Sequence, residues 1–82
     1  MERPFFAVLR ADGLFAVGSP RRGLSSSSEF LACASWFASA ASARRGARRA
    51  GLAVGWRVVR VPDDSDVALS LEASEASTLV VV

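Results

Sequence analysis

Hydrophobic residues near the start of the chain form two short runs, over residues 4–10 and 14–18, with Asp12-Gly13 between them. Aromatic and β-branched runs of this length are typical of strands. Asp-Gly favours a two-residue type I′ turn, because glycine tolerates the positive φ that this turn requires. The pattern therefore predicts a β-hairpin. Its register would pair Arg10 with Phe15, Leu9 with Ala16, and Val8 with Val17.

This register makes both faces of the hairpin apolar. One face would carry Phe6, Val8, Phe15 and Val17, with Arg10 at its end, and the other Phe5, Ala7, Leu9, Leu14 and Ala16. A hairpin with one solvated face would alternate apolar with polar residues, so we expect something to cover the second face. The cover is either the rest of the chain or an interface with a second copy or another protein. The candidate interface residues are Phe5, Leu9, Leu14 and Trp56.

A long helix is predicted from about Ser27 to Arg45. Ser26 and Glu29 have the spacing of a capping box, so the serines at 25–28 are expected to cap the helix. Gly46 would end or kink it, and Gly51 is a second possible stop. At 100° per residue the predicted helix has one apolar stripe, with Trp36 on its flank. The stripe contains Phe30, Cys33, Ala34, Phe37, Ala40 and Ala41. On this stripe Cys33 is expected to be a buried packing thiol.

Three further strands are expected after the helix. Residues 53–61 are rich in valine, residues 67–72 alternate apolar with polar, and residues 78–82 form a short final run. Pro62 and the acidic residues after it predict a turn, and residues 73–77 a connector or a single helical turn. The expected fold is a single α+β domain over residues 1–82. It has an antiparallel sheet in β-β-α-β-β-β order, with one long helix packed on one face.

The composition narrows the chemistry. The 82 residues include no histidine and no lysine, so the commonest general base and metal ligand is missing and Schiff-base chemistry is excluded. We expect a non-enzymatic protein with no cofactor and no metal. The single Cys33, the lack of a signal-peptide pattern, and a longest charge-free stretch well short of the roughly 20 apolar residues of a membrane span predict a cytoplasmic protein with no membrane partner.

Charge is divided unevenly along the chain. Residues 1–62 hold ten arginines against three carboxylates, a net charge of +7, whereas residues 63–82 hold five carboxylates and no base, a net charge of −5. The strongest basic cluster is Arg44, Arg45, Arg48 and Arg49. It is a candidate phosphate-binding or partner-binding patch, because guanidinium groups match phosphate oxygens. The alternatives are a favourable interaction with the helix dipole and pairing with the acidic residues of the same chain.

The acidic cluster is Asp63, Asp64 and Asp66, and it has three interpretations. Aspartate and serine favour turns, so a turn is the simplest. An acidic surface that meets a basic partner is the second. A Ca²⁺ or Mg²⁺ site is the third, although the spacing lacks the glycine and the closing glutamate of a calcium loop.

Three functions remain open. The chain resembles, in size, composition and expected architecture, the small inhibitors that phages encode against bacterial defence complexes, such as anti-CRISPR proteins. That resemblance implies a non-catalytic protein docked on a larger protein or nucleoprotein assembly, and no motif assigns roles to residues. The second function is a nucleic-acid-binding accessory protein that uses the basic cluster. The third is a self-associating structural protein, for example a homodimer, held together by hairpin faces or strand edges.

Overall fold

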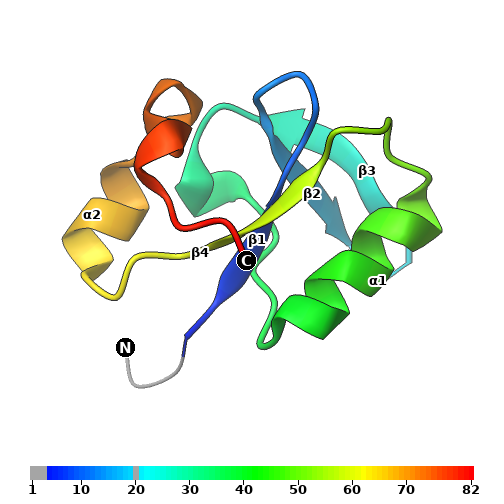
Figure 1. Ribbon diagram of the computed structural model, residues 1–82, viewed down its shortest axis with the longest axis horizontal. Helices are drawn as coiled ribbons and strands as arrows, with labels where there is room; N and C mark the ends of the chain where they lie inside the picture. The colour runs from blue at the N-terminus through cyan, green and yellow to red at the C-terminus, as the bar shows by residue number, and fades with distance from the viewer. Residues whose placement is uncertain (1–3, 20) are drawn as a thin grey trace.

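A four-stranded antiparallel sheet organises the computed structural model, which describes residues 4–19 and 21–82. The strands are β1 (Phe6–Leu9), β2 (Phe15–Ser19), β3 (Gly23–Ser28) and β4 (Arg57–Arg60), in the spatial order β3-β2-β1-β4. The helices are α1 (Ala40–Ala50), α2 (Ser65–Ser70) and two 3₁₀ helices, η1 (Leu31–Cys33) and η2 (Ala73–Thr78). The predicted α+β class is confirmed, although the order of elements differs in detail (Figure 1).

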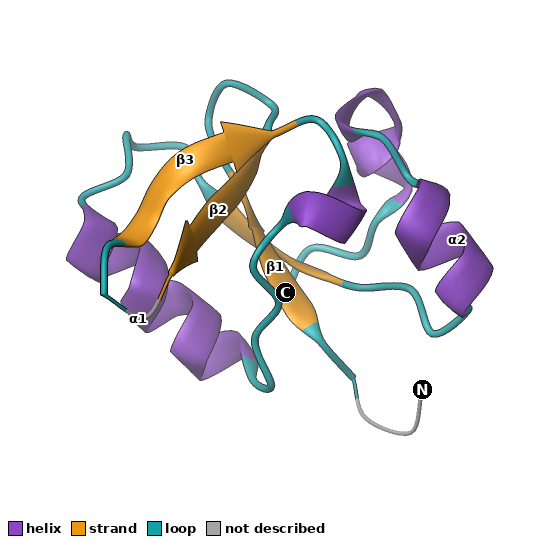
Figure 2. Cartoon of the chain, turned by 180° about the vertical axis from the view of Figure 1, so that it is seen from behind, coloured by secondary structure: helices purple, strands orange, loops and turns teal. Residues whose placement is uncertain are grey.

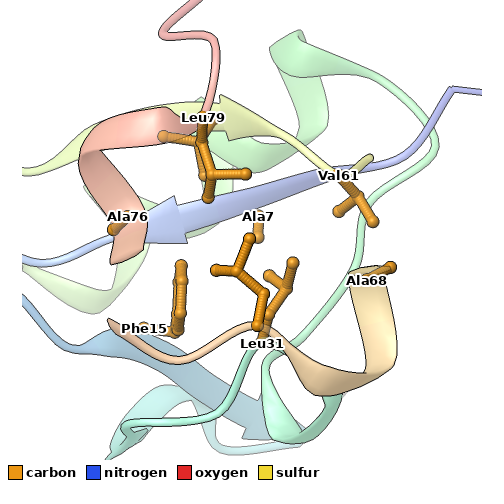
Figure 3. Close-up of a cluster of buried hydrophobic side chains, with 9 residues drawn as sticks. Ala7, Phe15, Leu31, Val61, Ala68, Ala76 and Leu79 are labelled. Carbon is orange, nitrogen blue, oxygen red and sulfur yellow. The ribbon is translucent and has the colours of Figure 1, made fainter. Parts of the chain in front are cut away.

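Helices cover both faces of the sheet, and each face has its own core. Because side chains alternate along a strand, Val8 and Val58 face α1, while Ala7 and Val59 face the opposite side. The α1 core contains Val8, Ala16, Leu24, Ala43, Ala47 and Val58. The opposite core contains Ala7, Phe15, Leu31, Val59, Val61, Ala68, Leu71, Ala76 and Leu79 (Figure 3). The apolar faces of the sheet are therefore covered largely by the chain itself.

The predicted register of the first hairpin is wrong by one residue. Leu9, and not Arg10, lies opposite Phe15. The N–H of Arg10 donates to the Leu14 carbonyl at 2.7 Å, which leaves a three-residue loop. Gly13, with φ of 87°, takes the left-handed position of such a loop, and Asp12 accepts from the Leu14 N–H at 3.1 Å. One extra loop residue moves every β2 side chain to the other face, so Phe15 joins Ala7 instead of Val8.

A segment between η1 and α1 lies between β1 and β2. The backbones of Phe6 and Phe37 exchange two hydrogen bonds, at 2.8 and 2.7 Å. On the other side the Ser35 N–H donates to the Ala16 carbonyl at 3.2 Å. β1 and β2 thus pair at Leu9 and Phe15 and separate toward their other ends, where this segment satisfies their backbone groups.

The predicted long helix is wrong over residues 27–39, and its predicted end near Arg45 is also wrong, because α1 continues through Gly46. Residues 25–28 form β3 on the edge of the sheet, where Ser28 pairs with Phe15 and Ser26 with Val17. Serine is an indifferent helix former, so pairing with β2 decides its conformation. The helix α1 begins after Ser39, whose side chain accepts from the Ser42 N–H at 3.1 Å, and it ends at Gly51 with φ of 66°.

The predicted strand over residues 67–72 is also wrong, because residues 67–70 belong to α2. Asp64 caps it by accepting from the N–H groups of Asp66 and Val67, at 2.9 and 3.4 Å. The buried residues are Ala68 and Leu71, at helical spacing, whereas Val67 and Leu69 are exposed. Alternation of apolar and polar residues over only six positions does not distinguish a strand from a short capped helix.

Two other predicted strands differ from the structure: the one over residues 53–61 is shorter, and residues 78–82 form no strand beyond a single bridge at Val81. Within residues 53–61 only β4 is a strand, paired with β1 from Phe6 opposite Arg60 to Leu9 opposite Arg57. Near the end of the chain, Val81 forms a bridge to Val59 on the outer edge of β4. The segment over residues 73–77, predicted as a connector or a single helical turn, is η2 (Figure 1).

Candidate phosphate-binding site

The helix α1 places its arginines away from the sheet. Ala43 and Ala47 are fully buried against the sheet, and their small side chains let the helix backbone approach it closely. Arg45, Arg48 and Arg49 are exposed, and Arg44 is half-buried. On an unbroken helix the apolar stripe predicted from Phe30 would continue through Arg44 and Arg48. Residues 30–37 are not part of α1, so its buried stripe lies at Ala43 and Ala47 instead.

The dipole of α1 explains only part of the basic cluster. Arg48 and Arg49 lie in the last turn, where a cation contributes about 0.3–1 kcal/mol. Arg44 and Arg45 lie in the middle of the helix, beyond the range of that effect. Arg45 is oriented by a hydrogen bond of 3.3 Å to the Ser42 hydroxyl.

The acidic residues do not neutralise these arginines. Among the described residues, the ion pairs join Arg10 with Asp12 at 3.0 Å and Arg60 with Asp63 at 3.5 Å. Asp64 caps α2, which packs on the face of the sheet opposite α1. The basic cluster on α1 and the acidic cluster at the start of α2 therefore lie on opposite sides of the sheet (Figure 1).

Two further arginines, outside the predicted basic cluster, lie beside α1. Arg21 and Arg22 belong to the turn between β2 and β3, which passes close to the C-terminal end of α1 (Figures 1 and 2). The Arg22 N–H donates to the Ser19 hydroxyl at 3.1 Å. Their signal in the sequence is a pair of arginines next to Gly23, but only a predicted β2–β3 hairpin would have placed them here.

A cleft of about 480 Å³ separates this turn from α1. Arg21 and Arg22 line it from the turn and Arg49 from the helix. Apolar residues line much of the rest: Leu24, Phe37, Gly46 and Ala50. We call this site the arginine cleft, and we call the exposed surface of α1 with Arg44, Arg45, Arg48 and Arg49 the arginine face. Arg49 belongs to both.

Hydrogen bonds between the Ser35 side chain and the Gly18 backbone hold one wall of the arginine cleft. The Ser35 hydroxyl accepts from the Gly18 N–H at 2.9 Å and donates to the Gly18 carbonyl at 3.3 Å. A Cβ atom at Gly18 would overlap the backbone of Gly23, so only glycine permits this approach of β2 and β3. The cleft is thus bounded by strand backbone on one side and by a capped helix on the other.

The predicted apolar interface is not brought together. Phe5 and Leu9 are half-buried against the core opposite α1, and Phe5 contacts Trp36 with ring centroids 5.8 Å apart. Trp56 packs instead against the α1 core. Leu14 is half-buried beside the first hairpin loop. These four residues therefore do not form one surface.

Cys33 is exposed, so its prediction as a buried thiol is wrong. It lies in η1, outside the helix whose stripe placed it in the core. In the acidic segment, Asp63 and Asp64 have the structural contacts described above, and Glu75 accepts from the Glu72 N–H at 3.1 Å as a cap of η2. Across the described part of the chain, no three acidic or cysteine side chains gather as a metal site would require.

No protein-family model, curated protein or solved structure matches the chain. Over residues 4–19 and 21–82, none of the helices has the length and apolar character needed to cross a membrane.

Proposed function

We propose that this chain is a small non-catalytic protein that binds nucleic acid, alone or within a nucleoprotein assembly, through the arginine face. The observation that supports the proposal is that Arg44, Arg45, Arg48 and Arg49 lie together on α1 without a carboxylate partner among the described residues. An arrangement of like charges that the fold does not neutralise is suited to a polyanionic partner.

The dimensions of α1 agree with this partner. Residues 44 to 49 extend over about 7.5 Å of helix axis at a rise of 1.5 Å per residue. A nucleic-acid duplex carries about four phosphate charges over that length, one per ~1.7 Å. Four arginines on one helix therefore match the charge density of a duplex backbone. Arg21 and Arg22 extend the basic surface beyond the helix.

Binding of this kind is expected to depend little on base sequence. Guanidinium contacts to phosphate fix the position of a protein on a strand but do not read bases. The residues between its arginines are Gly46, which has no side chain, and Ala47, which is buried, so the arginine face has no other side chain there that could read bases in a groove. The proposal therefore predicts similar affinities for unrelated sequences of equal length.

Fluorescence anisotropy with labelled single-stranded and duplex oligonucleotides tests the proposal. Changing Arg45 and Arg48 together to alanine should weaken binding at least tenfold at low salt. Arg57→Ala is the matched single-charge control for Arg48→Ala, because Arg57 is exposed and its side chain alternates along β4 with Val58, which faces α1. Equal losses from these two single variants, or no binding by the unaltered protein, would contradict the proposal.

Self-association is a second candidate, supported by the segment at residues 80–82. The Arg60 N–H donates to the Val80 carbonyl and the Val82 N–H to the Val58 carbonyl, both at 2.9 Å. This pattern directs the N–H and carbonyl of Val81 away from β4, and Val81 is 53% exposed. An apolar strand edge of this kind is able to pair with a second copy about a two-fold axis.

Sedimentation at several concentrations tests this candidate. Val81→Pro removes the outward N–H and keeps the Arg60 and Val82 N–H groups that bond this segment to β4, so it should shift a dimer to monomer while the fold persists. Val80→Thr is the control, because it alters a neighbouring side chain and leaves that N–H in place. A strict monomer at high concentration would exclude the candidate.

The phage-type inhibitor stays a prediction, since no particular residue supports it.

A further inference from the structure

We infer that the arginine cleft binds one nucleotide, either free or at the 5′ end of a strand, with its phosphate held by Arg21 and Arg22 on the β2–β3 turn. The inference deepens the proposed function and rests on it for the class of partner. It starts from a different observation, however, because the cleft adds an apolar hollow to the charge that the arginine face already provides.

The size of the cleft suits a small molecule better than a surface contact. Clefts that hold small molecules have volumes of about 300–1,000 Å³ and are mostly apolar, with a few polar groups that fix orientation. The arginine cleft has a volume of about 480 Å³. Phosphates on the outside of a strand need a charged surface but no cleft. The cleft therefore suits a ligand that also has an apolar part to bury.

The apolar lining of the cleft is suited to a flat ring. Phe37 and Leu24 both line it, and Gly46 presents bare backbone to the Phe37 ring. A Cβ atom at Gly46 would lie 3.1 Å from Cζ of Phe37, so glycine at this position lets the ring rest directly on α1. Stacking of a base on an aromatic side chain contributes about 1–3 kcal/mol and depends little on base identity.

The charges around the cleft orient the ligand. Ala50 lines the cleft at the C-terminal end of α1, where the helix dipole is negative and disfavours an anion. Arg21 and Arg22 lie at the opposite wall, on the β2–β3 turn. The phosphate is therefore directed toward the turn, and the base toward Ala50 and Phe37. Arg49 reaches the cleft from α1 and compensates for the dipole on that side.

An acidic peptide is the other anion that three arginines could recognise. Its carboxylates are carried on separate flexible side chains, whereas a nucleotide combines a compact anion with one planar ring. The cleft has basic groups at its turn wall and rim and an aromatic ring in its lining, and that division matches the nucleotide. Tetraglutamate therefore serves as the competing ligand in the experiment.

Isothermal titration calorimetry of the full chain with AMP, adenosine and inorganic phosphate provides the test. AMP should bind at least tenfold more tightly than either adenosine or phosphate, because both halves of the cleft contribute. Ala50→Phe fills the cleft without changing any charge and should weaken AMP binding at least tenfold. Arg22→Ala, at an exposed turn position where the backbone hydrogen bond to Ser19 is kept, should weaken it at least fivefold.

The matched control is the double variant Arg45→Ala/Arg48→Ala, which alters the arginine face and not the cleft. It should leave AMP affinity within threefold while it weakens binding of a long oligonucleotide. Circular dichroism and the melting temperature establish that Ala50→Phe is folded. A 5′-phosphorylated trinucleotide that competes with AMP identifies a strand terminus as the ligand, and failure to compete identifies the free nucleotide.

The inference is overturned if AMP binds no more tightly than phosphate, if tetraglutamate binds more tightly than AMP, or if neither Ala50→Phe nor Arg22→Ala changes AMP affinity. These results leave the proposed function standing when the Arg45→Ala/Arg48→Ala variant still loses oligonucleotide binding. The proposed function fails separately when the Arg45→Ala/Arg48→Ala variant binds the oligonucleotide as tightly as the unaltered protein, regardless of the affinity for AMP.

Discussion

Phe6 and Phe37 exchange two backbone hydrogen bonds, from the Phe6 N–H to the Phe37 carbonyl at 2.8 Å and from the Phe37 N–H to the Phe6 carbonyl at 2.7 Å. This pair connects the first strand to the segment that leads into α1. It also places the Phe37 ring against Gly46 and in the lining of the arginine cleft. The same contact thus stabilises the sheet and shapes the candidate site.

The contact between Phe37 and Gly46 is expected to reverse the usual effect of a glycine in a helix. Gly46→Ala at an unconstrained helical position would stabilise by about 1 kcal/mol. Here the new Cβ would lie 3.1 and 3.3 Å from Phe37 ring atoms, so we expect the free energy of unfolding to stay unchanged or fall. In a Phe37→Leu background the same change should stabilise by about 1 kcal/mol. Urea unfolding of the four proteins measures the coupling; equal stabilisation in both backgrounds would contradict the packing described.

Ser35 is expected to hold the cleft wall through Gly18. Ser35→Ala removes the hydroxyl that bonds both the N–H and the carbonyl of Gly18, so the free energy of unfolding should fall by about 1–2 kcal/mol. Hydrogen exchange of the Gly18 amide should accelerate more than that of neighbouring amides. Ser25→Ala, an exposed change on β3, is the control and should alter neither quantity.

The start of α1 can be located by two serine variants. Ser39→Ala removes the cap that accepts from the Ser42 N–H and should cost about 1 kcal/mol of stability. Ser26→Ala alters an exposed edge-strand residue and should change stability by less than about 0.5 kcal/mol. Thermal or urea unfolding of both variants decides the matter. A larger loss from Ser26→Ala would instead support a helix that starts at the serine run.

The sequence predicted the α+β class and the first hairpin, but not the register of that hairpin. Asp12-Gly13 correctly indicated the turn, because a left-handed glycine is needed there. The dipeptide did not distinguish a two-residue loop from a three-residue loop, which depends on the hydrogen bond between Arg10 and Leu14. A one-residue difference of this kind reverses the faces of a strand, so the predicted apolar interface could not be correct in detail.

Tertiary pairing decided the elements that the sequence predicted wrongly. The serines at 25–28 have only a weak preference for helix or strand, so their pairing with the backbone of β2 decides their conformation. Val67 and Leu69 alternate as in a strand, yet the Asp64 cap and the burial of Ala68 favour α2. The sequence predicted the basic cluster, but the predicted helix ended near Arg45, and only the continuation of α1 through Gly46 places all four arginines on one helix. The arginine cleft was not predictable, because Arg21 and Arg49 meet only after β2, β3 and α1 pack together.

The dependence of nucleic-acid affinity on salt concentration tests the arginine face most directly. Each phosphate neutralised contributes about −0.9 to the slope of log affinity against log salt for a duplex. If each arginine on α1 neutralises one phosphate, the unaltered protein should give a slope near −3.6, and Arg45→Ala/Arg48→Ala one near −1.8. Arg57→Ala should leave the slope unchanged. The same slope in the double variant as in the unaltered protein would contradict the assignment of binding to α1.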